Sequence, residues 1–198
     1  MKSLTQRILE YASREAEGVP LTSKALLHLG SRAAVDQALS RLASTNRLLR
    51  IGRGLYVRPE TTRFGPRPPL TENVMRGIEE SRGETVVPHG AAEANSLGLT
   101  TQVPVREIFL TSGRTRNLNL GGRDVELRHA PAWQLVLAHR VAGAAVRALA
   151  WAGRERAREV VTVLKARLSP SDVRELLAAR ARLPTWVARE VSTLTSYA

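Results

Sequence analysis

The chain contains no cysteine, only four histidines and only three aspartates among its 198 residues. The absence of cysteine excludes disulfide bonds, thiol catalysis and zinc sites built on thiolates. No His-x-x-x-His, His-x-Asp or Asp-x-Asp spacing occurs that would favour a metal site. The sequence offers no paired acidic metal ligands of the nucleotidyltransferase kind and no nucleophile near His89, so we expect a protein that is not an enzyme and uses no metal or other cofactor.

Long uncharged hydrophobic runs are also missing. The first 18 residues are charged throughout, unlike a signal peptide. The most apolar stretch, residues 133–151, carries His139, Arg140 and Arg147, and a charged side chain at the centre of a bilayer costs roughly 2.5–3.5 kcal/mol. Together with the lack of cysteine, this composition predicts a cytoplasmic protein that makes no membrane contact.

Positive charge is in excess, with a formal net charge of +12 at pH 7. Arginine supplies 27 of the 30 basic residues, and its guanidinium suits bidentate contacts with phosphate and guanine. Residues 1–69 hold 12 basic and 5 acidic groups, residues 70–131 hold 7 and 8, and residues 132–198 hold 11 and 5. The uneven distribution favours an anionic partner, nucleic acid first, although a GC-rich genome that encodes arginine in place of lysine would also raise the arginine count.

A proline cluster at Pro66, Pro68 and Pro69 predicts a stiff linker between two domains. We therefore expect an α+β protein with an N-terminal domain in residues 1–66 and a C-terminal domain in residues 70–198. The second domain is expected to be mixed α/β and to end in a helical bundle. Its expected strands are 85–87, 106–111, 116–120 and 123–129, and its expected helices are 71–81, 90–97, 132–151, 153–167, 170–181 and 184–194.

The N-terminal domain has the spacing of a winged helix-turn-helix. Apolar residues recur at helical spacing in three segments, 3–16, 22–29 and 31–44, and two β-prone runs follow at 47–51 and 55–58. Ser31 is a good N-cap for the third of these helices, because its hydroxyl can accept a backbone N–H that has no partner within the helix.

The third predicted helix has a polar face that suits the major groove of DNA. One side is apolar, and the other presents the four residues that we expect to contact bases or their surroundings: Arg32, Gln37, Ser40 and Arg41. Arginine can bind guanine and glutamine can bind adenine through paired hydrogen bonds. Asp36 lies on the same side and has two interpretations: it accepts a hydrogen bond from cytosine, or it orients Arg32 or Arg41 without touching DNA.

The two β-prone runs flank Gly52-Arg53-Gly54, which predicts a hairpin with glycines at its turn. Arg53 would lie at the tip, and we expect Arg47, Arg50 and Arg53 to contact phosphates or a minor groove. The set as a whole predicts binding to double-stranded DNA, by two copies or by cooperative monomers on a repeated site. A polar helix and a solvated arginine, taken singly, occur in many small domains that do not bind DNA.

These segments resemble a known family. Residues 30–42 and 48–57 resemble the N-terminal winged helix of AbiEi-type antitoxins. Further segments resemble the second half of the same proteins: Pro88-His89-Gly90-Ala91-Ala92, Leu97-Gly98-Leu99-Thr100, Leu110-Thr111-Ser112-Gly113 and His129-Ala130-Pro131. The resemblance covers nearly the whole chain, and its more specific parts are the hairpin and the Leu-Gly-Leu-Thr segment.

The resemblance implies the antitoxin of a type IV toxin–antitoxin system linked to phage defence. Such antitoxins repress transcription of their own operon through the N-terminal domain, and their C-terminal domain counters a nucleotidyltransferase-like toxin without a stable complex. Two alternatives stay open: a stand-alone winged-helix regulator, and an RNA-binding or toxin-interacting adaptor that does not bind operator DNA.

The C-terminal half carries weaker signals. His89 with Glu93 would be a catalytic pair only with a nucleophile that the nearby sequence does not offer, so a buried or helix-capping histidine is the better interpretation. Trp133, Trp151 and Trp186 lie among apolar residues and are expected in the core rather than stacked on bases. Short basic clusters are either solvated helix faces or an RNA surface: Arg114 and Arg116, and Arg154, Arg156 and Arg158.

Overall fold

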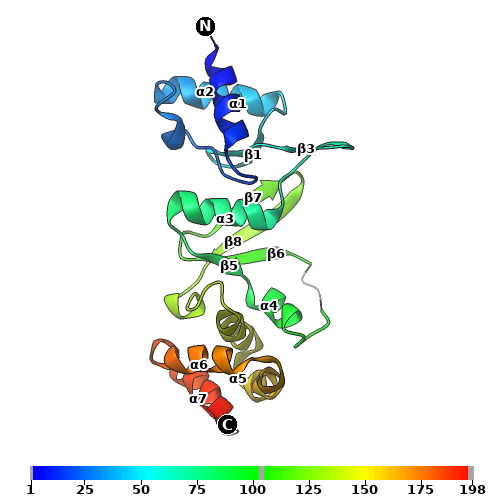
Figure 1. Ribbon diagram of the computed structural model, residues 1–198, viewed down its shortest axis with the longest axis vertical. Coiled ribbons are helices and arrows are strands. Elements are labelled where there is room, and N and C mark those ends of the chain that lie inside the picture. The colour runs from blue at the N-terminus through cyan, green and yellow to red at the C-terminus, as the bar shows by residue number, and fades with distance from the viewer. Residues whose placement is uncertain (1, 103–104, 196–198) are drawn as a thin grey trace. The chain divides into compact units, whose positions relative to one another are not determined.

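The computed structural model in Figure 1 describes residues 2–102 and 105–195. Within these ranges the protein is a mixed α+β fold with seven α-helices and small sheets, as the sequence predicts in outline. The chain divides into two compact units, Met1–Glu84 with Asn117–Val125, and Thr85–Arg116 with Glu126–Ala198.

Two α-helices frame the core of the first unit. Helix α1 (Leu4–Arg14) begins with a capping box between Ser3 and Gln6, and helix α2 (Arg32–Ser44) begins at Ser31, whose side chain accepts from the Ala34 N–H. The predicted Ser31 cap is therefore confirmed. The buried apolar faces of both helices meet in one cluster: Ile8, Ala12, Leu21, Leu26, Val35, Ala38, Leu39, Leu42, Leu48 and Tyr56.

The prediction of an α-helix over residues 22–29 is wrong. The structure has only a three-residue 3-10 helix there, η1 (Lys24–Leu26), held by a hydrogen bond from the Leu26 N–H to the Ser23 carbonyl. Leu26 is the one apolar side chain of this 3-10 turn that is buried, and the next residue, Leu27, is 48% exposed. A short segment with so little buried surface does not offset the cost of nucleating an α-helix.

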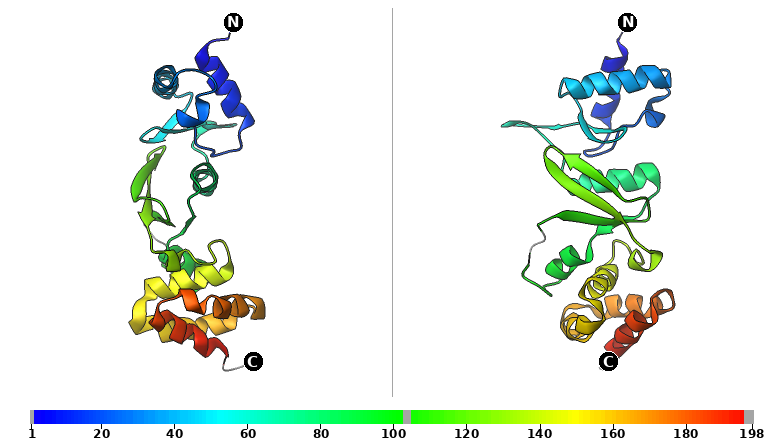
Figure 2. Two further views of the ribbon diagram at one scale, coloured as in Figure 1. Left: turned by 90° about the vertical axis from the view of Figure 1, so that its left-hand side faces the viewer. Right: turned by 180° about the vertical axis from the view of Figure 1, so that it is seen from behind.

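Two hairpins follow α2. Strands β1 (Leu49–Gly52) and β2 (Leu55–Val57) pair antiparallel, which confirms the hairpin predicted around Arg53, and Gly54 at its turn has a φ of 66°. Strands β3 (Glu60–Thr62) and β4 (Gly65–Arg67) form a second hairpin, which extends away from the helices of this unit in Figures 1 and 2.

The proline cluster is not a linker between compact units. Pro66 lies within β4 and is paired with Thr61, and Pro68 lies against Gly121, where an added Cβ would come within 2.2 Å of the proline ring. Helix α3 (Thr71–Arg82) also belongs to the first unit. A Cβ at Gly77 of this helix would lie 2.8 Å from the Pro20 ring, so glycine permits the close approach. The expected boundary between residues 66 and 70 therefore does not coincide with the division into compact units.

A four-stranded sheet has the order β5-β6-β8-β7. Its strands are β5 (Val86–Pro88), β6 (Glu107–Thr111), β7 (Arg116–Leu120) and β8 (Arg123–His129), close to the predicted ranges. The β7–β8 turn is Gly121-Gly122, with φ angles of 62° and 95°, as a two-residue hairpin requires. The tip of this hairpin, Asn117–Val125, groups with the first unit.

Helices make up most of the second unit. They are α4 (Gly90–Ser96), α5 (Val141–Arg167), α6 (Pro170–Ala178) and α7 (Thr185–Ser192), and the last three share one apolar core. The predicted start of the helix at 132–151 is wrong. Ala132–Gln134 form only a 3-10 turn, and α5 begins at Val141. Gly153 interrupts α5 at the predicted break, with φ 75° and ψ 176°, a conformation that only glycine adopts readily.

A buried ion pair joins α4 to α5. The Arg147 guanidinium, 2% exposed, donates to the Glu93 carboxylate from Nε at 3.0 Å and from Nη2 at 2.7 Å. Nη2 also donates to the Ala138 carbonyl at 2.8 Å. A Cβ at Gly90 would lie 2.2 Å from the Arg147 carbonyl oxygen, so glycine at this position lets the two helices come together.

Replacing Glu93 should therefore destabilise the protein strongly. The Glu93→Ala variant leaves a buried guanidinium without its counter-ion, which typically costs about 3–5 kcal/mol. Urea denaturation followed by circular dichroism measures this loss. The matched control is Lys2→Ala, which removes a charge from an exposed ion pair with Glu10 and should leave the midpoint unchanged. Equal midpoints for Glu93→Ala and the wild type would contradict the importance of this pair.

Candidate nucleic-acid interface

Helix α2 separates its side chains into a buried and an exposed face. Val35, Ala38, Leu39 and Leu42 are at most 5% exposed and belong to the core. The four residues predicted to lie at or near bases are all exposed: Arg32, Gln37, Ser40 and Arg41. Gln37 and Ser40 lie near the middle of the exposed face, because at 100° per residue they point away from the buried side.

The three arginines that we expect to contact phosphates lie in or just before the β1–β2 hairpin. Arg50 lies opposite Tyr56 in the strand register, and Arg53 and Gly54 form the turn. Arg47, just before β1, is exposed, as are Arg50 and Arg53. The apolar side chains of the hairpin, Leu55 and Tyr56 among them, are buried, so the basic residues project from a packed base.

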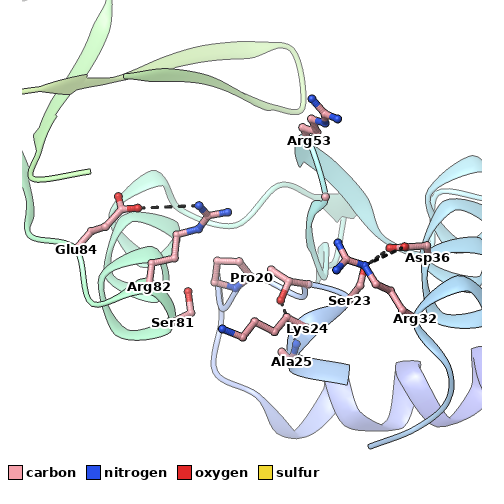
Figure 3. Close-up of a pocket in the computed structure, with 12 residues that line it drawn as sticks. Pro20, Ser23, Lys24, Ala25, Arg32, Asp36, Arg53, Ser81, Arg82 and Glu84 are labelled. Atoms are coloured by element: carbon pink, nitrogen blue, oxygen red, sulfur yellow. Dashed lines mark hydrogen bonds and ion pairs between the residues drawn. The ribbon is translucent and has the colours of Figure 1, made fainter. Parts of the chain in front are cut away.

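One pocket of the first unit brings α2 and the hairpin together. It has a cavity volume of about 900 Å³, and four basic side chains line it, Lys24, Arg32, Arg53 and Arg82 (Figure 3). Arg32 comes from the start of α2, Arg53 from the hairpin turn, Lys24 from η1 and Arg82 from the end of α3. Five of the seven predicted residues do not line this pocket: Gln37, Ser40, Arg41, Arg47 and Arg50.

Sequence reasoning missed two of these four basic residues. Lys24 lies in the segment that was expected to be an ordinary helix, and Arg82 lies in a helix that was assigned to the other domain. No spacing in the sequence connects them, because they meet only when α3 packs against the Gly18–Pro20 segment of the same unit.

Asp36 is exposed on α2 and makes two contacts within the first unit. Its carboxylate accepts a hydrogen bond from the Ser23 hydroxyl, and it forms an ion pair with Arg32, one helical turn earlier, at 3.9 Å. This ion pair is the contact expected if Asp36 orients Arg32, and the alternative contact with cytosine stays a prediction. Ser23 is only 8% exposed, so the bond also ties η1 to α2.

The pocket has a surplus of unpaired positive charge. Asp36 faces Arg32, and Glu84 lies 4.0 Å from Arg82. Within the described residues, Lys24 and Arg53 have no acidic partner. The Lys24 ammonium and the Arg53 guanidinium are thus free to bind phosphate oxygens.

His89 and Glu93, the pair considered for catalysis, are both engaged in structural contacts. His89 caps α4, since its Nδ1 accepts from the Ala91 N–H at 3.2 Å, and the carboxylate of Glu93 is occupied by Arg147. His89 is therefore the helix-capping histidine that the sequence favours. In the part of the chain that the structure describes, no three histidine, aspartate or glutamate side chains come close enough to hold a metal, and no helix has the length and apolar character to cross a bilayer.

A family model matches residues 7–169, which include α2, both hairpins and the four-stranded sheet. The chain belongs to DUF6088, a family of unknown function. The comparisons with curated proteins and with solved structures found no match. Helices α6 and α7 of this DUF6088 protein lie beyond the matched residues.

The second unit of this DUF6088 protein places two arginines over tryptophan rings. The Arg154 guanidinium lies 5.9 Å from the centre of the Trp186 ring, and that of Arg156 lies 4.9 Å from the Trp151 ring. Trp133, Trp151 and Trp186 pack against the apolar core, as expected, while remaining partly exposed. The Trp151 and Trp186 rings therefore already lie beneath the protein's own arginines.

The stability of this DUF6088 protein should fall in mild acid because of His89. Burial, and then the Arg128 charge, lower the pKa of His89 below its usual value, while Glu126 opposes them. As the pH falls through about 6.5, the unfolded chain binds this proton more readily than the folded protein does. The free energy of unfolding is therefore unaffected by the titration of His89 above that pH, and it decreases below it as the unfolded chain takes up the proton.

Thermal melts at about pH 7.5 and about pH 5.5 measure this effect. The wild type should lose more melting temperature on acidification than the His89→Asn variant, because asparagine keeps the N-cap acceptor and does not titrate in this range. An equal loss in both proteins would show that His89 does not contribute.

Proposed function

We propose that this protein is a DNA-binding transcriptional repressor whose first unit acts as a winged helix-turn-helix. In this proposal α1, the η1 segment and α2 form the helical part, and the β1–β2 hairpin is the wing. The observation that carries the proposal is that the start of α2 and the hairpin turn line one basic pocket, through Arg32 and Arg53. A helix and a wing on one surface can hold the same duplex.

The exposed face of α2 is suited to the major groove. Gln37 and Ser40 are short or planar polar side chains near its middle, and Gln37 can form paired hydrogen bonds with adenine. Arg32 and Arg41 lie toward its two edges, where they can contact guanine or the flanking phosphates. Since Asp36 is held by Ser23 and Arg32, its negative charge is partly compensated beside the DNA.

The wing and η1 supply contacts with the DNA backbone. Arg47, Arg50 and Arg53 are exposed on or beside the hairpin, and Lys24 adds a cation at the pocket. Phosphate contacts release counter-ions from DNA and so make affinity depend on salt. Two copies, or cooperative monomers, would occupy a repeated operator.

DNA binding is tested by fluorescence anisotropy on a duplex from the region upstream of the protein's own gene. Affinity should fall steeply between about 50 and 200 mM salt. Arg53→Ala should weaken binding to all duplexes and reduce the salt slope by about 1, whereas Gln37→Ala should cost about 1–3 kcal/mol and relax sequence choice.

The matched control is Arg7→Ala, which removes the same charge from an exposed position on α1. It should bind as the wild type does. If Arg7→Ala and Arg53→Ala weaken binding equally, the effect is one of net charge, and the assigned surface is wrong.

The proposal extends to the antitoxin role that the resemblance to AbiEi-type proteins implies. The first unit would autoregulate the operon, and the second would counter a nucleotidyltransferase-like toxin. The stand-alone regulator and the RNA-binding adaptor remain the alternatives. The second unit supports an RNA contact only through exposed arginines such as Arg154 and Arg156, which already lie over Trp186 and Trp151.

Co-expression with a nucleotidyltransferase-like toxin encoded beside the gene tests this role. The full-length protein should restore growth, and the Arg53→Ala variant should do so too, because neutralisation is assigned to the second unit. No rescue by the wild type would reject the antitoxin role and favour the stand-alone regulator. Rescue that is lost with Arg53→Ala would place protection in DNA binding instead.

A further inference from the structure

The β3–β4 hairpin carries an exposed aromatic ring at its tip. Phe64 is 86% exposed, and the Arg63 guanidinium lies 4.6 Å from the centre of its ring. The hairpin reaches away from the helices of the first unit (Figure 2). A single exposed apolar side chain is ordinary on a protein surface, so what distinguishes this ring is its place at the tip of a projecting hairpin with an arginine over it.

This hairpin, which we call the arm (Glu60–Arg67), has a defined structure. At its tip the Thr62 hydroxyl donates to the Gly65 carbonyl at 2.8 Å, and the Phe64 N–H donates to the Thr62 hydroxyl oxygen at 3.2 Å. At its base Arg67 forms an ion pair with Glu17 at 3.9 Å. The same carboxylate accepts from the N–H of Leu70 at 3.0 Å. The ring is therefore presented on an anchored stalk, which reduces the entropy lost on binding.

The arm is poorly suited to pairing with a strand of a second copy. Within the described residues, β3 and β4 pair only with each other. Pro66, in β4, has no N–H to donate, and a proline in an edge strand blocks the addition of another strand. The charge of the arm instead favours an anionic partner. Arg58 pairs with Glu60 at 3.5 Å and Arg67 with Glu17, and Arg63 at the tip has no acidic partner within the described residues.

The chain connects the arm directly to the proposed wing. Strand β2 ends at Val57 and β3 begins at Glu60, with only two residues between them. Each strand of the arm has three residues, and at about 3.3 Å per residue the stalk is roughly 10 Å long. The minor groove of B-DNA is about 7.5 Å deep, so a tip of this length can reach the base edges.

We infer that the arm enters the minor groove beside the segment held by α2 and the wing, and that Phe64 wedges into a base step there. The inference rests on the proposed function, since it requires the first unit to bind duplex DNA. Apolar side chains inserted at the minor groove unstack a base step and bend the duplex, and a neighbouring arginine favours a narrow groove. Arg63 lies beside the ring in the position for such a contact.

The experiment uses the full-length protein and the upstream duplex described above. Phe64→Ala should lower affinity about 5- to 140-fold, the range expected from the loss of one stacked aromatic ring. It should also reduce the bend measured by circular-permutation electrophoresis. Val105→Ala is the matched control, because it trims another fully exposed apolar side chain, and it should change neither measurement. Since Phe64 is exposed, Phe64→Ala should melt at the wild-type temperature.

A Phe64→Trp variant reports the contact directly. Its emission, after subtraction of the wild-type signal, should be quenched by the duplex, because stacking on bases quenches indole fluorescence. The arm inference would be overturned if Phe64→Ala changed neither affinity nor bend and the duplex did not change the Phe64→Trp emission. If the wild type still bound DNA in a salt-dependent way, the proposed function would stand. No binding by the wild type would overturn both.

Two further outcomes also count against the arm inference. A blue shift of the Phe64→Trp emission on anionic phosphatidylglycerol vesicles, without a response to DNA, would assign the tip to a lipid surface. A change in molecular mass between the wild type and Phe64→Ala in analytical ultracentrifugation would assign it to a contact between copies.

Discussion

Burial of one face of α2 is the constraint on which the first unit depends. Val35, Leu39 and Leu42 pack against residues from α1, η1 and the β1–β2 hairpin in a single cluster. Each such apolar side chain contributes about 1.5–3 kcal/mol when it leaves water. Once that face is fixed, the rotation of α2 is fixed as well, and Gln37 and Ser40 must face outward. The polar surface is therefore a consequence of the core.

Charge pairing then determines which basic groups are available to a ligand. Asp36 engages Arg32 and Ser23, and Glu84 lies close to Arg82, so these arginines are oriented by the protein itself. Lys24 and Arg53 have no such partner within the described residues. A surface that combines oriented and unpaired cations suits a polyanion better than it suits a single small anion, because several separate positions must be met at once.

The sequence predicted most elements closely, and each of its errors has its own physical cause. Helices α1, α2 and α3 and the β7–β8 hairpin follow from apolar spacing, caps and a glycine pair. The helix at 22–29 failed because helical spacing was present where little apolar surface could be buried. The start of the helix at 132–151 failed because the chain turns at Leu137, whose φ is 54°, before α5 begins. Pro66 was taken as a linker, yet a two-stranded arm tolerates proline at its edge.

The sequence by itself determined the local structure: the Ser31 cap, the amphipathic α2 and the arginine at a glycine-flanked turn all depend on neighbours within a few residues. The tertiary structure alone decided which basic side chains from distant segments lie around one pocket. Lys24, Arg32, Arg53 and Arg82 come from separate elements and line one pocket only because α3 packs on the first unit. Contacts between distant segments depend on the packing of whole faces, and no short spacing in the chain encodes them.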